Sequence, residues 1–107
     1  YTALVQQHLP QVGPGNILSE PSRKNTAPCI AYVTYKLMQL DSKASFIVAP
    51  SDHLILDQTA FVKVCLEALN FVNKHSALLT LGIQPTYPNT GYGYIQYDQQ
   101  AVTSNVY

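Results

Sequence analysis

The amino-acid sequence predicts an α/β fold in which a mostly parallel sheet is flanked by helices. Helical and extended patterns alternate along the 107 residues, and this alternation is typical of layered α/β domains. Two of the extended segments, residues 45–50 (SFIVAP) and 77–83 (ALLTLGI), are almost continuously apolar, as expected for strands covered on both faces. A chain of this length suits one domain rather than two, so we expect residues 1–107 to form a single domain.

The N-terminal part is expected to contain a short helix, a loop and a brief strand. Apolar residues at helical spacing predict the helix over residues 1–9, and Pro10 ends it. Residues 10–16 combine two glycines with two prolines, which indicates a loop. Residues 17–21 begin with two apolar side chains and end at a proline, and we assign them to the strand.

Two longer helices are predicted on either side of the first apolar strand. Over residues 26–41 apolar side chains recur at helical spacing, and Asn25 or Thr26 can cap the first free N–H groups. Residues 59–74 show the clearest amphipathic pattern. After the second apolar strand and a turn-rich stretch, a last strand is expected around Ile95.

The composition argues against several classes of function. The formal charge is zero, and Arg23 and Lys24 form the only adjacent basic pair, so nucleic-acid binding lacks an electrostatic basis. No apolar run approaches the roughly 18 residues of a membrane span. Charged residues make up only 11%, which suggests faces covered by other structure. Cys29 and Cys65 fall within apolar helical patterns, so we expect two reduced thiols and a cytoplasmic protein.

Three loops are candidates for ligand binding, because ligands of open α/β sheets bind beyond the carboxyl ends of the strands. These loops are residues 20–25, 51–53 and 84–93. The second loop reads Ser-Asp-His, the residue types of a hydrolase triad. Consecutive residues of an extended segment point to opposite sides, so the aspartate cannot orient the histidine, and we reject a triad.

Asp52 in the second loop has two interpretations. A carboxylate at the end of a strand suits Mg²⁺, which commonly binds one or two carboxylates together with substrate phosphates. The same carboxylate could instead cap the following segment, and the residue pattern alone favours this cap. His53 is more typical of a hydrogen-bonded structural histidine than of a base or ligand.

The third loop contains the sequence TGYGY at residues 90–94. Its two glycines would allow a ligand to approach the backbone, where N–H groups could hold sugar hydroxyls. A plain turn explains the same pattern equally well, and the tyrosines could be strand packing residues. The loop lacks the third glycine and the following helix of a dinucleotide fingerprint, and no GxxxxGK[ST] phosphate loop occurs in the chain.

Three collinear segments resemble the mannose-1-phosphate guanylyltransferases, a branch of the sugar-1-phosphate nucleotidyltransferase family. Residues 19–31 (SEPSRKNTAPCIA) resemble the family segment EPxxRNTAPAIA, and residues 47–57 (IVAPSDHLILD) resemble VxPSDHxIxD. Residues 79–95 (LTLGIQPTYPNTGYGYI) resemble TxGIxPTxPxTGYGYI. The resemblance covers nearly all of residues 16–98, and it implies an incomplete Rossmann-like nucleotidyltransferase fold.

The resemblance also implies an activity and a set of site residues. Members of this family transfer GMP from GTP to mannose 1-phosphate, giving GDP-mannose and pyrophosphate. Asp52 would be the catalytic residue that binds Mg²⁺. The expected contacts to the nucleotide are Asn25, Thr26, Ala27 and Ser51, and the expected contacts to mannose are Gly91, Tyr92 and Gly93.

The chain also departs from the family pattern. Lys24 stands where the family usually has arginine, and Arg23 could take over its role. The glycine-rich phosphate loop that opens these enzymes has no counterpart, and a second metal-binding aspartate is expected only after Tyr107. We therefore expect a partial catalytic domain that is inactive alone. Two alternatives are another sugar-1-phosphate nucleotidyltransferase and a non-catalytic binding or regulatory domain of the same fold.

The missing part has a structural consequence. The resemblance implies that the strand leading into the phosphate loop is central in the sheet. Without it, one of the remaining strands would expose an unpaired edge. We expect either re-pairing by the strand at residues 17–21 or a homo-oligomer formed through this exposed edge.

Overall fold

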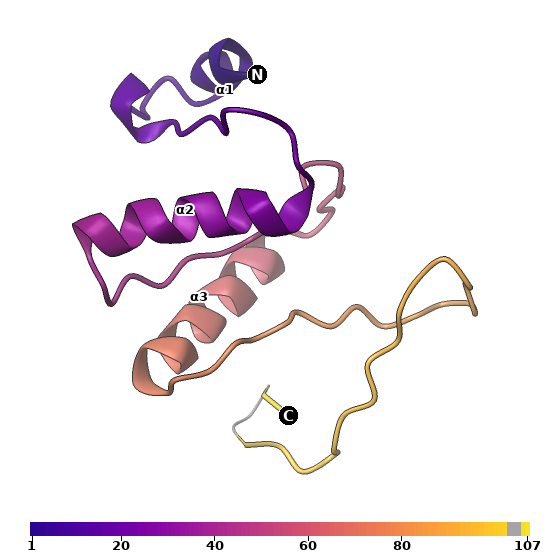
Figure 1. The fold of residues 1–107 in the computed structure, drawn as a ribbon. Helices are drawn as coiled ribbons and strands as arrows, with labels where there is room; N and C mark the ends of the chain where they lie inside the picture. The colour runs from indigo at the N-terminus through magenta and orange to yellow at the C-terminus, as the bar shows by residue number, and fades with distance from the viewer. Residues whose placement is uncertain (103–105) are drawn as a thin grey trace. The chain divides into compact units, whose positions relative to one another are not determined.

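The computed structural model describes residues 1–102 and 106–107, and its regular elements are helical (Figure 1). In chain order, these elements are α1 (Thr2–His8), the short 3-10 helix η1 (Pro14–Asn16), α2 (Thr26–Leu40) and α3 (Gln58–Lys74). The chain divides into two compact units, Tyr1–Ser76 and Ala77–Tyr107. All four helical elements lie in the first unit.

The three predicted helices are confirmed, and the local reasons are visible at their ends. The Asp57 side chain caps α3 by accepting a hydrogen bond from the Ala60 N–H at 2.9 Å. Lys74 lies in the last turn of α3, where a positive charge is favourable to the helix dipole. At Asp41 the backbone becomes extended and α2 ends.

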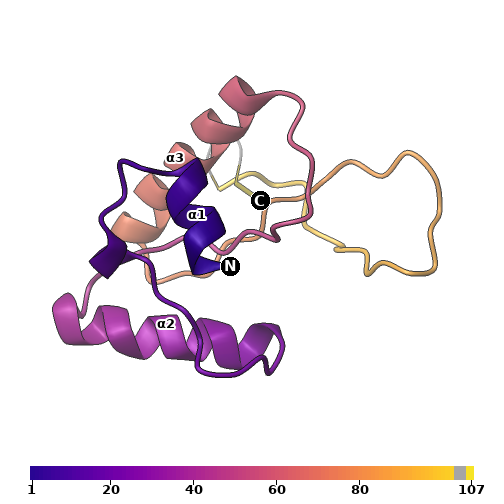
Figure 2. The same ribbon diagram turned by 90° about the horizontal axis from the view of Figure 1, so that it is seen from above.

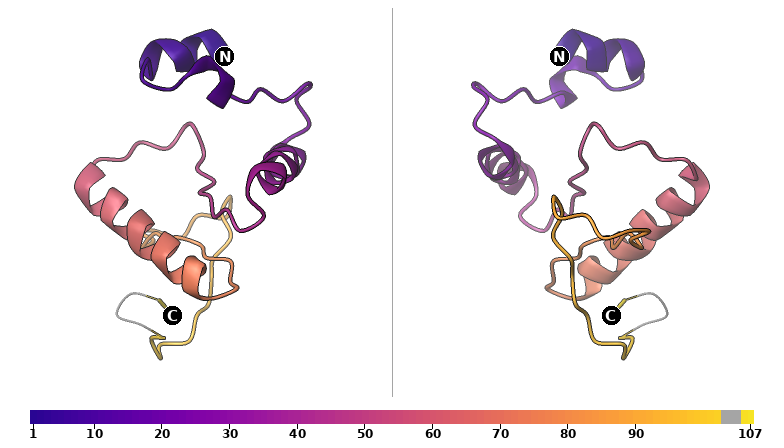
Figure 3. Two further views of the ribbon diagram at one scale, coloured as in Figure 1. Left: turned by 90° about the vertical axis from the view of Figure 1, so that its left-hand side faces the viewer. Right: turned by 90° about the vertical axis from the view of Figure 1, so that its right-hand side faces the viewer.

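The predicted parallel sheet is wrong. Among residues 1–102 and 106–107 there is no strand, only an isolated bridge at Val106. The segments predicted as strands run as irregular chain between and after the helices, as the turned views in Figures 2 and 3 also show. An apolar run favours an extended backbone, but a strand also needs a neighbour that pairs with its N–H and C=O groups. None of the described segments supplies that neighbour.

The predicted re-pairing of residues 17–21 is wrong for the same reason. Ile17 continues from η1, and its N–H donates to the carbonyl oxygen of Pro14 at 3.3 Å. The sheet edge through which we expected oligomers to form is likewise not found in residues 1–102 and 106–107. The described residues thus leave the apolar segments without partner strands.

The apolar segments are consequently exposed. Among the described side chains only Cys65, on α3, is buried, with 7% of its surface accessible. Leu78 and Ile83, in the segment predicted as a strand covered on both faces, are 101% and 81% exposed. Both cysteines are free; Cys65 is buried, but Cys29, which we also expected in the core, is only half-buried. The described part of the chain therefore has almost no hydrophobic core of its own.

Residues 46–49 are the apolar segment with the most definite position. They line a hollow of about 210 Å³ together with Cys29, Ile30 and Val33 of α2. Just before this segment, Ser45 Oγ donates a hydrogen bond of 2.7 Å to Asn73 Oδ1 of α3. These contacts hold the chain that leads into the Ser51–His53 loop. None of the helices in the described ranges is long and apolar enough to cross a membrane.

Candidate functional site

Asp52 lies in a turn directly after residues 45–50, and its side chain is exposed. The interpretation of Asp52 as a helix cap is wrong, because the side chain that caps α3 belongs to Asp57. Within the described ranges the Asp52 carboxylate accepts no hydrogen bond and forms no ion pair. Ser51 and His53 are exposed too, and no hydrogen bond joins either of them to Asp52. The carboxylate is therefore free to bind a ligand.

The Asp52 carboxylate has the chemistry that Mg²⁺ requires, since Mg²⁺ binds hard oxygen ligands. Among the residues that the structure describes, no group of three or more His, Cys, Asp or Glu side chains is placed to hold a metal ion. Asp52 can thus supply one ligand, and the remaining ligands have to come from substrate phosphates, water or further protein.

The start of α2 combines a strained backbone with open hydrogen-bonding groups. Asn25, one of the two residues expected to cap α2, occupies the N-cap position, but the expected cap is absent because its side chain accepts no hydrogen bond there. Its backbone has φ 70° and ψ −173°, a region that is sparsely populated by residues other than glycine and costs about 1–3 kcal/mol. Thr26 and Ala27 follow and are exposed. The Asn25 amide and the first N–H groups of α2 are thus available to a ligand.

Two basic residues, Arg23 and Lys24, precede this helix start, and of the two only Arg23 interacts with another described residue. The Arg23 guanidinium carbon lies 4.9 Å from the centroid of the Tyr1 ring, a cation–π arrangement. Lys24 is exposed and has no hydrogen bond or ion pair with the described residues. The geometry therefore favours Lys24 over Arg23 as the cation available to a bound anion.

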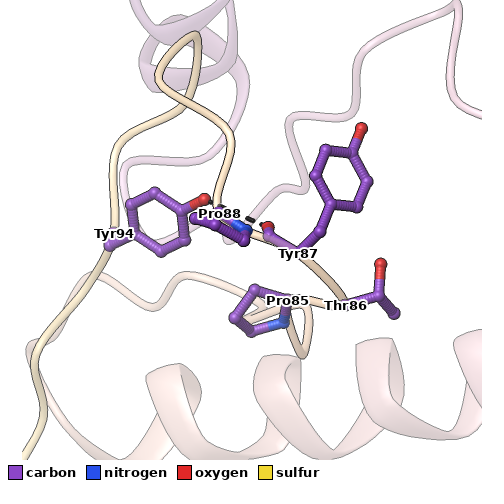
Figure 4. Close-up of a pocket in the computed structure, with 5 residues that line it drawn as sticks. All are labelled: Pro85, Thr86, Tyr87, Pro88 and Tyr94. Carbon is purple, nitrogen blue, oxygen red and sulfur yellow. Dashed lines mark hydrogen bonds between the residues drawn. The ribbon is translucent and has the colours of Figure 1, made fainter.

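The third loop belongs to the unit Ala77–Tyr107. A hollow of about 300 Å³ lies beside it, and Figure 4 shows the residues that line this hollow: Pro85, Thr86, Tyr87, Pro88 and Tyr94. The Tyr94 side chain points toward the backbone at Tyr87 and Pro88 (Figure 4). Tyr94 does not pack in a strand, contrary to one of the two interpretations of the loop tyrosines.

The two glycines of this loop differ in their surroundings. A Cβ atom added to Gly91 would lie 3.2 Å from Asn89 Oδ1, which is a tight contact. A Cβ atom added to Gly93 would meet nothing within 4 Å. Close approach of another protein group therefore accounts for Gly91, whereas the space around Gly93 is open to a ligand.

The described contacts do not join all predicted site residues. Asp52, Ser51 and the start of α2 belong to one unit, and no described hydrogen bond or ion pair connects Asp52 to Asn25 or Thr26. The glycine loop belongs to the other unit. Sequence reasoning missed Asn89, whose side chain and backbone hold this loop. An asparagine two residues before a glycine is a turn signal that could have indicated it.

Comparison with known proteins gives one consistent result. Residues 2–106 match the family described as nucleotidyl transferase. The chain is 37% identical over 94 residues to a mannose-1-phosphate guanylyltransferase of Escherichia coli, an alignment that covers 86% of this chain and 20% of the relative.

Two further relatives take part in polysaccharide biosynthesis, according to their names. The chain is 38% identical over 95 residues to the xanthan biosynthesis protein XanB of Xanthomonas campestris, covering 87% of this chain and 20% of the relative. It is 40% identical over 80 residues to the alginate biosynthesis protein AlgA of Pseudomonas aeruginosa, covering 75% and 16%. The chain thus spans about a fifth of the length of these relatives. No solved structure shows a significant match.

Proposed function

The chain belongs to the nucleotidyl transferase family, and on that premise we propose that it forms part of a mannose-1-phosphate guanylyltransferase. Such an enzyme transfers GMP from GTP to mannose 1-phosphate and produces GDP-mannose and pyrophosphate. The observation that carries the proposal is the 37% identity to the Escherichia coli enzyme over 86% of this chain. Because the alignment covers only 20% of that relative, the activity is proposed for a longer protein that contains this chain.

In this proposal Asp52 supplies a carboxylate ligand to Mg²⁺. With Asp52 among its ligands, Mg²⁺ would supply positive charge to offset the charge on the phosphates during transfer. The supporting observation is that the Asp52 carboxylate is exposed and accepts no hydrogen bond from the described residues, whereas Asp57 caps the following helix. The sugar phosphate is itself the nucleophile in this reaction, so the chain needs no nucleophilic side chain.

The start of α2 is proposed to bind the nucleotide. The Asn25 side chain has both donor and acceptor atoms, and it is not consumed by capping. Thr26 and Ala27, which are exposed, add the N–H groups of the first turn. Ser51, in the second candidate loop (residues 51–53), adds a hydroxyl group. The exposed Lys24 ammonium, which pairs with none of the described residues, is proposed to interact with the phosphates.

The loop of Gly91, Tyr92 and Gly93 is proposed to bind the mannose ring. All three residues are exposed, and the open space at Gly93 allows a ligand to reach the backbone. Tyrosine rings suit the apolar faces of sugars, and their hydroxyls suit the polar edges. We also propose a cytoplasmic location, which the two free thiols support.

The isolated chain is proposed to be inactive and to associate with further copies. Its apolar segments are exposed, as Leu78 shows, and apolar segments without partners favour association between chains. In the longer protein these segments would be covered by the additional sequence that the relatives possess.

A chimeric enzyme tests the proposed roles. In it, the aligned 86% of this chain replaces the corresponding segment of the Escherichia coli relative. We expect the chimera to release pyrophosphate from GTP and mannose 1-phosphate. The variant Asp52→Asn should lower kcat about 100-fold, which corresponds to roughly 2.7 kcal/mol of lost transition-state stabilisation.

The matched control makes the same chemical change at another exposed aspartate. Asp98 accepts a hydrogen bond from the Gln100 N–H at 3.2 Å, and Asp98→Asn should leave turnover near the unsubstituted level. Near-normal turnover in Asp52→Asn would remove Asp52 from the proposed metal site.

A further inference from the structure

In the third loop (residues 84–93) and the residue that follows it, one hydroxyl group, that of Tyr94, bonds the backbone at Asn89 and Tyr87. Tyr94 Oη accepts a hydrogen bond from the Asn89 N–H at 2.6 Å. The same hydroxyl is within donating distance of two carbonyl oxygens, that of Asn89 at 3.2 Å and that of Tyr87 at 3.4 Å. Figure 4 shows the Tyr94 ring beside this stretch of backbone. The hydroxyl therefore fixes the distance between Asn89 and Tyr94, the residues on either side of the loop tip.

Asn89 transmits this constraint to the N–H groups of Gly91 and Tyr92, the two residues before Gly93. Its Oδ1 atom accepts a hydrogen bond from the Gly91 N–H at 2.9 Å, and its backbone oxygen accepts one from the Tyr92 N–H at 3.3 Å. Asn89 thus holds the tip of the loop on one side while Tyr94 holds Asn89 on the other. Loss of the Tyr94 hydroxyl would loosen both connections.

These bonds decide which glycine N–H remains for a ligand. The N–H of Gly91 is occupied by Asn89. Within the described ranges the N–H of Gly93 donates no hydrogen bond, and the space around Gly93 is open. Gly93 therefore supplies the donor, and Gly91 serves the geometry of the loop.

We propose that Tyr94 is a positioning residue for the sugar phosphate: its hydroxyl fixes Asn89 and so presents the free N–H of Gly93 to a sugar hydroxyl. This inference rests on the proposed function, because that function makes the loop a mannose 1-phosphate site. Tyr94 touches no reacting atom and acts through Asn89.

Amide hydrogen exchange of the chimera described above, followed by mass spectrometry of the peptides that contain Asn89, tests the contact without any substrate. In Tyr94→Phe the ring remains and the hydroxyl is lost, so the Asn89 N–H should exchange about two- to tenfold faster, as expected for the loss of one hydrogen bond. The control is Tyr97→Phe, since Tyr97 contacts the Tyr107 ring at 5.1 Å and its hydroxyl bonds no described residue. Unchanged exchange at Asn89 in Tyr94→Phe overturns the proposal.

Kinetics of the chimera described above test the positioning role. Tyr94→Phe should raise KM for mannose 1-phosphate about two- to tenfold and leave kcat and KM for GTP unchanged, with Tyr97→Phe again as the control. A purely structural role would lower the active fraction and kcat without this selective change in KM, and that result also overturns the proposal. A chimera that does not turn over mannose 1-phosphate contradicts the proposed function, and hydrogen exchange still decides the Tyr94 contact.

Discussion

Replacing Asp57 by alanine should unravel the first turn of α3, and the effect can be estimated from one hydrogen bond. Asp57 Oδ1 accepts the Ala60 N–H at 2.9 Å, and loss of such a cap costs about 1 kcal/mol. That energy changes the equilibrium between the capped and the frayed helix start roughly fivefold. The negative charge at the helix N-terminus contributes a further stabilisation of about 0.3–1 kcal/mol.

Circular dichroism at the helical minimum measures this loss in the 107-residue chain. The signal is accessible because α3 has 17 residues, more than α2 with 15 or α1 with 7. We expect Asp57→Ala to lose the most helicity, because both cap and charge are gone. Asp57→Asn should lose less, because asparagine caps as well as aspartate.

The informative control is Asp52→Ala, which should leave helicity unchanged because Asp52 accepts no hydrogen bond from the described residues. If Asp52→Ala lowered helicity as much as Asp57→Ala, the carboxylate of Asp52 would be the cap. The reasoning that leaves Asp52 free for a metal ion would then be refuted.

Three further predictions concern the backbone of Asn25, the burial of the two cysteines and the contact at Gly91. In the chimera, Asn25→Gly should keep the free energy of unfolding unchanged or raise it by up to about 2 kcal/mol in denaturation experiments. The reason is that glycine relieves the strain at φ 70°, partly offset by its entropic cost, and a clear loss of stability would contradict the strain. A thiol reagent should modify the half-buried Cys29 faster than Cys65, which is 7% exposed, and equal rates would contradict these positions. Gly91→Ala should disturb the amide resonances of Asn89, whose Oδ1 lies 3.2 Å from the added methyl position; unchanged resonances would contradict that contact.

The helices could be predicted from the sequence because their determinants are local. From the spacing of the apolar residues, the predicted bounds of α2 and α3 lie within one residue of the observed bounds at each end. The residue that caps α3 was harder to predict, because two aspartates precede the helix. Only the observed first residue, Gln58, shows that Asp57 and not Asp52 occupies the N-cap position.

The sheet could not be predicted reliably because strand pairing is not local. Residues 77–83 have the composition of a buried strand, yet Leu78 is fully exposed in the structure. The apolar pattern indicates that a strand here would require a pairing strand and other elements packed on its faces. It does not indicate whether the described chain contains them. The Tyr94–Asn89 hydrogen bond was also missed, since it depends on the path of the turn between the two residues.

In the candidate site too, the positions of residues along the chain could be predicted, whereas their backbone conformations and contacts could not. Asn25 was predicted at the start of α2 and lies there, but its positive φ and its unused side chain are visible only in the structure. Asp52 was predicted to end an apolar segment, and it does so without a strand. The roles of these residues stay predictions until binding is measured.

The substrate preference of the chimera tests the central claim most directly, because both the α2 start and the glycine loop come from this chain. Pyrophosphate release should be compared for GTP against other nucleoside triphosphates and for mannose 1-phosphate against glucose 1-phosphate. We predict a clear preference for GTP with mannose 1-phosphate, and no release from the relative that lacks the segment. A folded chimera that is inactive, or that prefers another base or sugar, would contradict the assignment of this chain to a mannose-1-phosphate guanylyltransferase.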